Sequence, residues 1–152
     1  MGSSAPDPIT EITMQITRTP AETMAGPSAW FTGAVHLDPI ATPAGPSRLQ
    51  ASNVHFAPGA RTAWHTHPRG QTLHVTEGIC LTQRRGGPVE IVRPGERVTV
   101  EPGEDHWHGA APDRFMSHLA LQDVDDQGSG VTWGEHVSDE EYHAAPATPP
   151  GP

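Results

Sequence analysis

Apolar and polar residues alternate in short runs along most of this chain, and each run ends near Gly or Pro. A period of two places successive side chains on opposite faces of an extended strand. Residues 12–16 alternate strictly, and similar runs follow at 30–37, 49–56, 62–67, 72–76, 79–83, 89–92, 97–100, 106–110 and 115–122. Short strands separated this regularly by turn residues are typical of an antiparallel sandwich or barrel. The pattern therefore predicts an all-β fold.

One short helix is predicted near the C-terminus. Ser138 and Glu141 have the spacing of a capping box, in which the side chain of each residue bonds the backbone of the other. The two chain ends differ from the rest. We expect residues 1–11 to form a flexible N-terminal tail and residues 144–152 to form a disordered Pro-rich tail. Residues 12–143 then form one barrel domain.

Composition narrows the classes of function. The chain has 152 residues, a net charge of −9 and no Lys, which argues against nucleic acid and anionic membranes as partners. Cys80 is the only cysteine, so an intrachain disulfide and a Cys-rich zinc site are excluded. No apolar segment reaches the length of a membrane span, and we expect a soluble cytoplasmic protein.

The histidines carry the clearest sign of chemistry. His65 and His67 lie two positions apart, so both imidazoles leave the same face of an extended segment. Gln71 follows a Pro-Arg-Gly turn that can bring its amide oxygen back toward that face, and His106 supplies a fourth donor. Three imidazoles and one neutral oxygen can hold a divalent cation and leave positions open for water or substrate. The arrangement predicts a catalytic metal centre.

Three further polar residues are candidates for catalysis. His108 lies two positions beyond His106, so it points into the same cavity without being needed as a ligand. A neutral imidazole beside a metal ion is a competent base near pH 7, although His108 is equally explained as a residue that lines the pocket. His118 and Gln122 share one face of a strand. They either stabilise an anion and position the substrate or form a satisfied polar cluster in the barrel.

The substrate pocket is predicted to include one face of the run at 49–56, namely Ser52, Val54 and Phe56. Arg61 is expected to have a structural role and to hold a carboxylate at the barrel rim, such as Glu101 or Glu104. Cys80 lies in an apolar context and is expected to be an inert core thiol.

Large apolar residues suggest self-association. Trp30, Phe31 and Trp107 are bulky for a small barrel whose interior already holds a polar site. Some of them are therefore expected to cover subunit interfaces, which predicts a homodimer or a homotetramer.

Two spaced motifs resemble those of the cupins. The first is Gly59-x5-His65-x-His67-x3-Gln71-x6-Gly78, with Gln where most members carry Glu. The second is Gly95-x7-Gly103-x2-His106, in which Pro102 is shifted by one place and Ala110 replaces the terminal Asn. The resemblance implies a single antiparallel β-barrel of the jelly-roll type.

A narrower resemblance is to the small single-domain bacterial cupins that include the manganese-dependent hydroxynitrile lyases. The segments that carry it are 29–33, 58–67, 70–72, 106–111 and 118–120. Those proteins bind manganese through three His and one Gln and cleave cyanohydrins to an aldehyde and cyanide. The resemblance implies manganese here, with iron, zinc and nickel as alternatives, and it implies the ligands His65, His67, Gln71 and His106.

The predicted function is that of a metal-dependent lyase acting on a small cyanohydrin-type molecule, with His108 as the base. Two alternatives stay open: a metal-dependent dioxygenase, and a non-enzymatic cupin that binds a small molecule or a metal. Lyase activity should persist without oxygen, which separates the lyase from the dioxygenase.

Overall fold

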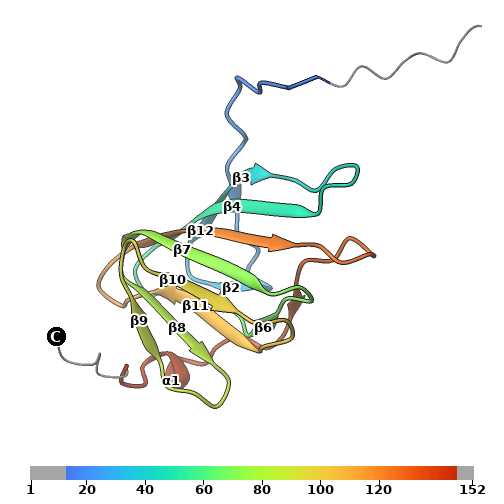
Figure 1. Ribbon diagram of the computed structural model, residues 1–152. Coiled ribbons are helices and arrows are strands. Elements are labelled where there is room, and N and C mark those ends of the chain that lie inside the picture. The colour runs from blue at the N-terminus through green and yellow to red at the C-terminus, as the bar shows by residue number, and fades with distance from the viewer. Residues whose placement is uncertain (1–12, 147–152) are drawn as a thin grey trace, which may run out of the picture.

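The computed structural model describes residues 13–146, which form two antiparallel sheets curled around a common interior (Figure 1). The first sheet has the order β1 (Met24–Ala25), β3 (Val35–Ala41), β4 (Leu49–Phe56), β12 (Met116–Asp123), β7 (Gln71–Gly78) and β10 (Arg97–Val100). The second has the order β13 (Thr132–Trp133), β6 (His65–Thr66), β11 (His106–Ala110), β5 (Arg61–Thr62) and β2 (Phe31–Thr32). β8 (Cys80–Arg84) pairs with both β11 and β9 (Glu90–Val92).

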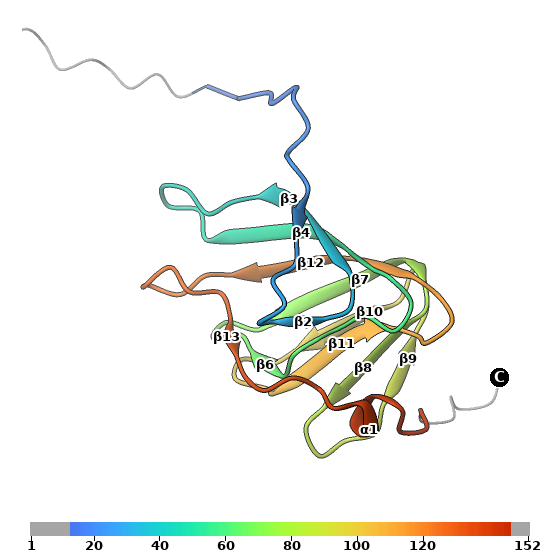
Figure 2. The ribbon, with the colours of Figure 1, turned by 180° about the vertical axis from the view of Figure 1, so that it is seen from behind.

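The only helix in the described residues is α1 (Asp139–Tyr142), which lies beside β8 and β9 (Figures 1 and 2). The predicted fold is confirmed: the chain is an all-β antiparallel jelly-roll barrel with a short C-terminal helix. The part of the chain that the structure describes contains no helix long and apolar enough to cross a membrane.

Side chains that alternate inward along the strands fill the space between the sheets. On β4, for example, Val54 and Phe56 are buried in this core, whereas Asn53 and His55 are not. The other buried members are Phe31, Val35, Ala60, Leu73, Val75, Cys80, Val92, Ala110, Met116 and Ala120. Burial raises the pKa of Cys80 to about 12, so its thiol stays protonated at neutral pH.

The strand predicted at residues 12–16 is wrong over residues 13–16, the part that the structure describes. Ile12 lies outside the described residues. Residues 13–16 are not in a strand, and Met14 and Ile16 are 87% and 62% exposed. Alternation alone does not make a strand, because an extended segment also needs a neighbouring strand for its backbone hydrogen bonds.

The two predicted tails fall mostly beyond the described residues. Residues 1–11 and 147–152 lie outside them, and residues 144–146 are in neither a helix nor a strand. The tail predictions therefore remain predictions.

A second core cluster lies between β11 and α1. Trp107 is fully buried there, together with Trp64, Leu81, Val89, Val137 and Tyr142. The predicted capping box is present: the backbone N–H of Glu141 donates to Ser138 Oγ at 3.1 Å, and that of Ser138 donates to Glu141 Oε1 at 2.9 Å. The Tyr142 hydroxyl donates to the carbonyl oxygen of Ala110 at 2.6 Å. The helix therefore braces β11 from outside the barrel.

Arg61 links the barrel to the helix instead of to a rim carboxylate. Its guanidinium donates to the carbonyl oxygen of Val137 at 2.9 Å and to Asp139 Oδ1 at 2.8 Å. The expected structural role stands, but the expected partners, Glu101 and Glu104, are wrong. The capped helix places Asp139 close to β5, an arrangement that spacing along the chain does not reveal.

The large apolar residues are distributed differently from the expectation. Trp107 is 0% and Phe31 is 7% exposed within one chain, so neither can cover a subunit interface. Trp30 is 41% exposed. A homodimer or homotetramer remains a prediction, and of these three residues Trp30 alone now supports it.

Gly78 closes the turn between β7 and β8 in a conformation that excludes a side chain. Its φ is +74°, and a Cβ atom built on it would lie 1.8 Å from the carbonyl oxygen of Phe115. Gly95 has a similar φ of +88°, but no atom lies within 4 Å of the corresponding Cβ position. A substitution at Gly95 therefore causes backbone strain alone, whereas one at Gly78 causes both backbone strain and steric overlap.

We expect Gly95→Ala to lower the free energy of unfolding by about 1–2 kcal/mol, the usual cost of a left-handed residue with a Cβ atom. Gly78→Ala should cost clearly more, because the backbone of β12 must also move. Chemical denaturation of both variants measures the difference. Equal losses would show that the contact with Phe115 relaxes freely.

Candidate metal centre

Two strands of the second sheet bring the predicted histidine ligands together. His65 on β6 and His106 on β11 are direct partners in the antiparallel ladder, and their ring centres are 4.2 Å apart. His67 directly follows β6, and its ring centre lies 5.0 Å from that of His65 and 5.4 Å from that of His106. Each of the three is only 2% exposed. Ligands predicted from two separate motifs therefore meet at one buried point.

Backbone carbonyl groups set the proton positions of these rings. Each Nδ1 atom lies at hydrogen-bond distance from a carbonyl oxygen: His65 from Ala63 at 2.8 Å, His67 from Gly130 at 2.6 Å and His106 from Glu104 at 3.0 Å. A carbonyl oxygen can only accept, so each Nδ1 carries the hydrogen and each neutral ring keeps a lone pair on Nε2. Metal-binding histidines are held in the same way in other proteins.

The amide of Gln71 adds a fourth lone pair. Its Nε2 donates to Gln122 Oε1 at 3.0 Å, which turns its Oε1 atom toward His106 Nε2 at 3.3 Å. Both of these facing atoms are acceptors, and no hydrogen is available between them. The Nε2 atom of His67 is also buried without a hydrogen-bond partner. Acceptors that converge in this way repel one another unless a cation lies among them.

Burial keeps these rings neutral. It lowers the pKa of His65 well below its ordinary value, and the neighbouring His106 and His67 lower it further. Burial likewise lowers the pKa of His106 to about 4 and also lowers that of His67. Neutral imidazoles and an amide oxygen are donors that suit a divalent transition metal, so the residues present fit such an ion.

His108 lies next to the same group and forms a pair with His118. Ligand atoms of His65, His106 and His108 lie within 4.8 Å of one another, so these three buried histidines could hold a metal ion. This group contains His108 in place of the predicted ligand His67. His108 Nδ1 lies 2.9 Å from His118 Nε2, while His108 Nε2 and His118 Nδ1 have no hydrogen-bond partner. Because His108 Nδ1 is occupied by His118, its Nε2 is the atom left for a metal or a substrate.

A cavity of about 380 Å³ opens onto these histidines. The predicted pocket residues Ser52, Val54 and Phe56 all line it, as do His108, His118 and Gln122. The ring of Phe56 packs 6.0 Å from that of His108 and 5.3 Å from that of His118. Every site residue that the sequence predicted lines this cavity except His106, which packs against His65 at its edge.

Two kinds of residue line the cavity that the sequence pattern did not predict as site residues. Trp30 and Trp133 stack with ring centres 5.4 Å apart, and Trp133 also lies 4.7 Å from the ring of His65. Gln50 lines the cavity from β4 and accepts a hydrogen bond from Gln122. The pairing of β13 with β6 brings Trp133 to the site, and no local motif signals that pairing.

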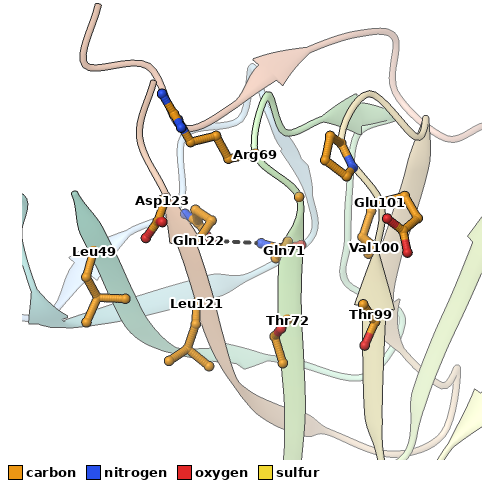
Figure 3. Close-up of a pocket in the computed structure, with 12 residues that line it drawn as sticks. Leu49, Arg69, Gln71, Thr72, Thr99, Val100, Glu101, Leu121, Gln122 and Asp123 are labelled. Carbon is orange, nitrogen blue, oxygen red and sulfur yellow. Dashed lines mark hydrogen bonds between the residues drawn. The ribbon is translucent and has the colours of Figure 1, made fainter. Parts of the chain in front are cut away.

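A second hollow, of about 340 Å³, has Gln71 and Gln122 in its wall as well (Figure 3). Figure 3 shows their hydrogen bond between β7 and β12, with Arg69, Glu101 and Asp123 around it. Its charged lining differs from the aromatic wall of the cavity. The two glutamines therefore occupy the boundary between the buried site and this outer hollow.

Comparison with known proteins agrees with the motifs. The cupin-domain family matches residues 52–119. An (R)-mandelonitrile lyase from Granulicella tundricola is 52% identical over 117 residues, which cover 77% of this chain and 88% of that protein. The chain belongs to the cupin family. The matched segment of this cupin contains all four predicted ligands, but Gln50, Gln122 and Trp133 lie outside it.

Solved structures show the same fold. A cupin-like protein from Thermotoga maritima is 37% identical to this cupin, with a TM-score of 0.74, over 84% of this chain and 95% of that chain. A polyketide cyclase from Streptomyces resistomycificus has a TM-score of 0.60 at 21% identity, over 86% of this chain and 91% of that chain. At that identity the likeness concerns the fold alone.

We expect the purified cupin to bind about one divalent ion per chain, because the lone pairs of its predicted ligands converge on one point. A His67→Ala, His106→Ala double variant should lose the ion, whereas Gln71→Ala should only weaken binding. His74→Ala, on an exposed residue of β7, serves as the matched control. Metal analysis after dialysis measures the outcome, and full occupancy in the double variant would contradict the ligand assignment.

Proposed function

We propose that this cupin is a metal-dependent lyase that cleaves and forms the C–C bond of a cyanohydrin. The observation that carries the proposal is the His108–His118 pair, which lies beside the converging lone pairs at the end of a largely apolar cavity. The 52% identity to a protein named (R)-mandelonitrile lyase supports the same reaction class.

The predicted ligands His65, His67, Gln71 and His106 would hold the metal, and manganese is the proposed ion. Iron, zinc and nickel are alternatives, since imidazole donors accept all of them. When bound, a divalent ion supplies Lewis-acid polarisation of a substrate oxygen. A neutral donor set leaves the charge of the ion uncompensated. The ion would therefore polarise a substrate oxygen more strongly than it would with a carboxylate among its ligands.

His108 is the proposed base. If His108 Nδ1 carries the hydrogen shared with His118 Nε2, the Nε2 atom of His108 is free to accept the hydroxyl proton of the cyanohydrin, and the proposal assigns that tautomer. The electrons of the O–H bond then form the carbonyl, and the C–C bond breaks with its electron pair on cyanide. His108 then transfers this proton to cyanide, so the products are an aldehyde and hydrogen cyanide.

His118 and Gln122 orient the reacting groups. His118 is fully buried against Phe56, and its bond to His108 holds the ring of the base in place. Gln122 donates one Nε2 hydrogen to Gln50 Oε1, which leaves the second hydrogen of the same amide for an anionic or nitrile group in the cavity. Both residues therefore position the substrate in this proposal.

The cavity favours an aromatic substrate. The ring centre of Trp133 lies 5.4 Å from that of Trp30 and 5.6 Å from that of Phe31. Aromatic surface is presented to the cavity by these three residues and by Phe56. Aromatic rings attract one another in stacked or edge-to-face contact. We therefore propose an aryl cyanohydrin, with mandelonitrile as the test compound.

The decisive experiment on the base compares His108→Ala with wild type on mandelonitrile under nitrogen. The variant should retain the metal ion and lose about 10²–10⁴-fold in rate, because general-base catalysis contributes that much. His74→Ala, away from the cavity, is the control and should keep the wild-type rate. A His108→Ala rate within about threefold of wild type would exclude the role of His108 as the base.

Turnover that needs oxygen would favour the dioxygenase alternative, and metal binding without turnover would favour a non-enzymatic cupin.

The aromatic wall gives a separate prediction. Trp30→Ala should raise the KM for mandelonitrile by roughly 2–10-fold, since an aromatic pair contributes about 0.5–1.5 kcal/mol. The KM for a small aliphatic cyanohydrin should change less, and Trp30→Phe should recover most of the loss. Steady-state kinetics on both substrates checks this, and equal changes in both KM values would argue against an aryl pocket.

A further inference from the structure

Three glutamine side chains form a line of hydrogen bonds that ends at the metal centre. Gln71 Nε2 donates to Gln122 Oε1 at 3.0 Å, and Gln122 Nε2 donates to Gln50 Oε1 at 2.9 Å. The three residues come from β7, β12 and β4, which are neighbours in the first sheet, and all three line the cavity. Gln122 and Gln50 are direct partners in the ladder.

The direction of this line decides which atom of Gln71 faces the histidines. A glutamine amide rotates readily about its last bond, and its two ends have opposite hydrogen-bonding properties. Only the oxygen can bind a cation. Gln122 accepts from Gln71 and so holds the oxygen of Gln71 toward His106. Gln122 is itself an amide, however, and it needs an acceptor of its own to stay in this orientation.

Gln50 supplies that acceptor at a tightly packed point. A Cβ atom built on Gly130 would lie 2.7 Å from Gln50 Oε1, so the absence of a side chain at position 130 makes room for the amide. The carbonyl oxygen of the same Gly130 accepts from His67 Nδ1 at 2.6 Å. Gln50 and Gly130 are therefore neighbours, and each supports a different predicted ligand: Gln50 acts on Gln71 through Gln122, and Gly130 accepts from His67.

We infer that Gln50 is a positioning residue for the metal centre: it orients Gln122, which in turn keeps the oxygen of Gln71 turned toward the histidines. This inference rests on the metal centre of the proposed function but not on the lyase reaction. Gln50 and Gly130 both lie outside the segment that matches the cupin-domain family.

The test measures the dissociation constant for Mn²⁺ on metal-stripped protein, by competition with a fluorescent chelator. Gln50→Leu keeps a similar volume but removes the acceptor, and it should weaken Mn²⁺ binding by about 10-fold, as losses of supporting hydrogen bonds at metal sites typically do. Gln50→Glu keeps an acceptor for Gln122, so its affinity should equal or exceed that of wild type. Asn53→Leu, an amide replacement on β4 away from the cavity lining, should leave the affinity unchanged.

Gly130→Ala perturbs the amide of Gln50 without changing Gln50 itself. Its Cβ atom must displace the amide of Gln50, so this variant should also bind Mn²⁺ more weakly. Because the Gly130 carbonyl also supports His67, this variant does not replace Gln50→Leu. If Gln50→Leu does not fold, Gln50→Met removes the same acceptor, and thermal melting of each metal-free variant checks folding.

Wild-type affinity in Gln50→Leu would overturn the inference, as would equal weakening in Gln50→Leu and Gln50→Glu, which would point to shape instead of an acceptor. A wild-type protein that binds none of Mn²⁺, Fe²⁺, Zn²⁺ and Ni²⁺ would overturn the metal centre and this inference together. A wild-type protein that binds Mn²⁺ and shows the predicted order of affinities, yet leaves mandelonitrile intact, would remove the lyase proposal alone and support the role of Gln50.

Discussion

Unprotonated acceptor atoms converge at one buried point of this barrel, and the surrounding structure maintains that arrangement. Carbonyl oxygens take the Nδ1 hydrogens of three histidines, so their Nε2 lone pairs face inward. The hydrogen bond from Gln71 to Gln122 turns a further lone pair the same way. Such an arrangement is unfavourable without a cation, because facing acceptors repel and are cut off from water. The backbone and the glutamines thus prepare a site for a positive charge.

The position of the site within the barrel makes that charge effective. Aromatic and aliphatic groups line most of the cavity, and an apolar surrounding strengthens electrostatic interactions compared with water. The same surrounding keeps the histidines neutral, since burial lowers the pKa of His118 to about 4 and also lowers that of His108. A neutral His108 beside a cation can accept a proton from a substrate hydroxyl group. In the proposed reaction, metal binding and proton transfer would both depend on this buried environment.

β11 joins this chemistry to the stability of the fold. All five of its residues are buried, because its two faces meet different partners. His106 and His108 point toward the site, whereas Trp107 packs in the second core cluster with Tyr142 of α1. The C-terminal segment thus covers the outer face of the strand that carries two site histidines. On the same strand, His106 pairs with His65 of β6.

Local pattern and spacing in the sequence predicted most of the strands, the capped helix and the set of histidines, but not β1 or β13. Alternation placed His65 with His67 and His106 with His108 because a two-residue period is a property of each strand alone. The tertiary structure decided the rest: that Trp107 packs beneath α1, that Arg61 reaches Asp139, and that Trp133 and Gln50 adjoin the cavity. These contacts join residues far apart in the chain. They depend on strand order and register, which arise from the packing of the whole barrel and which no single segment encodes.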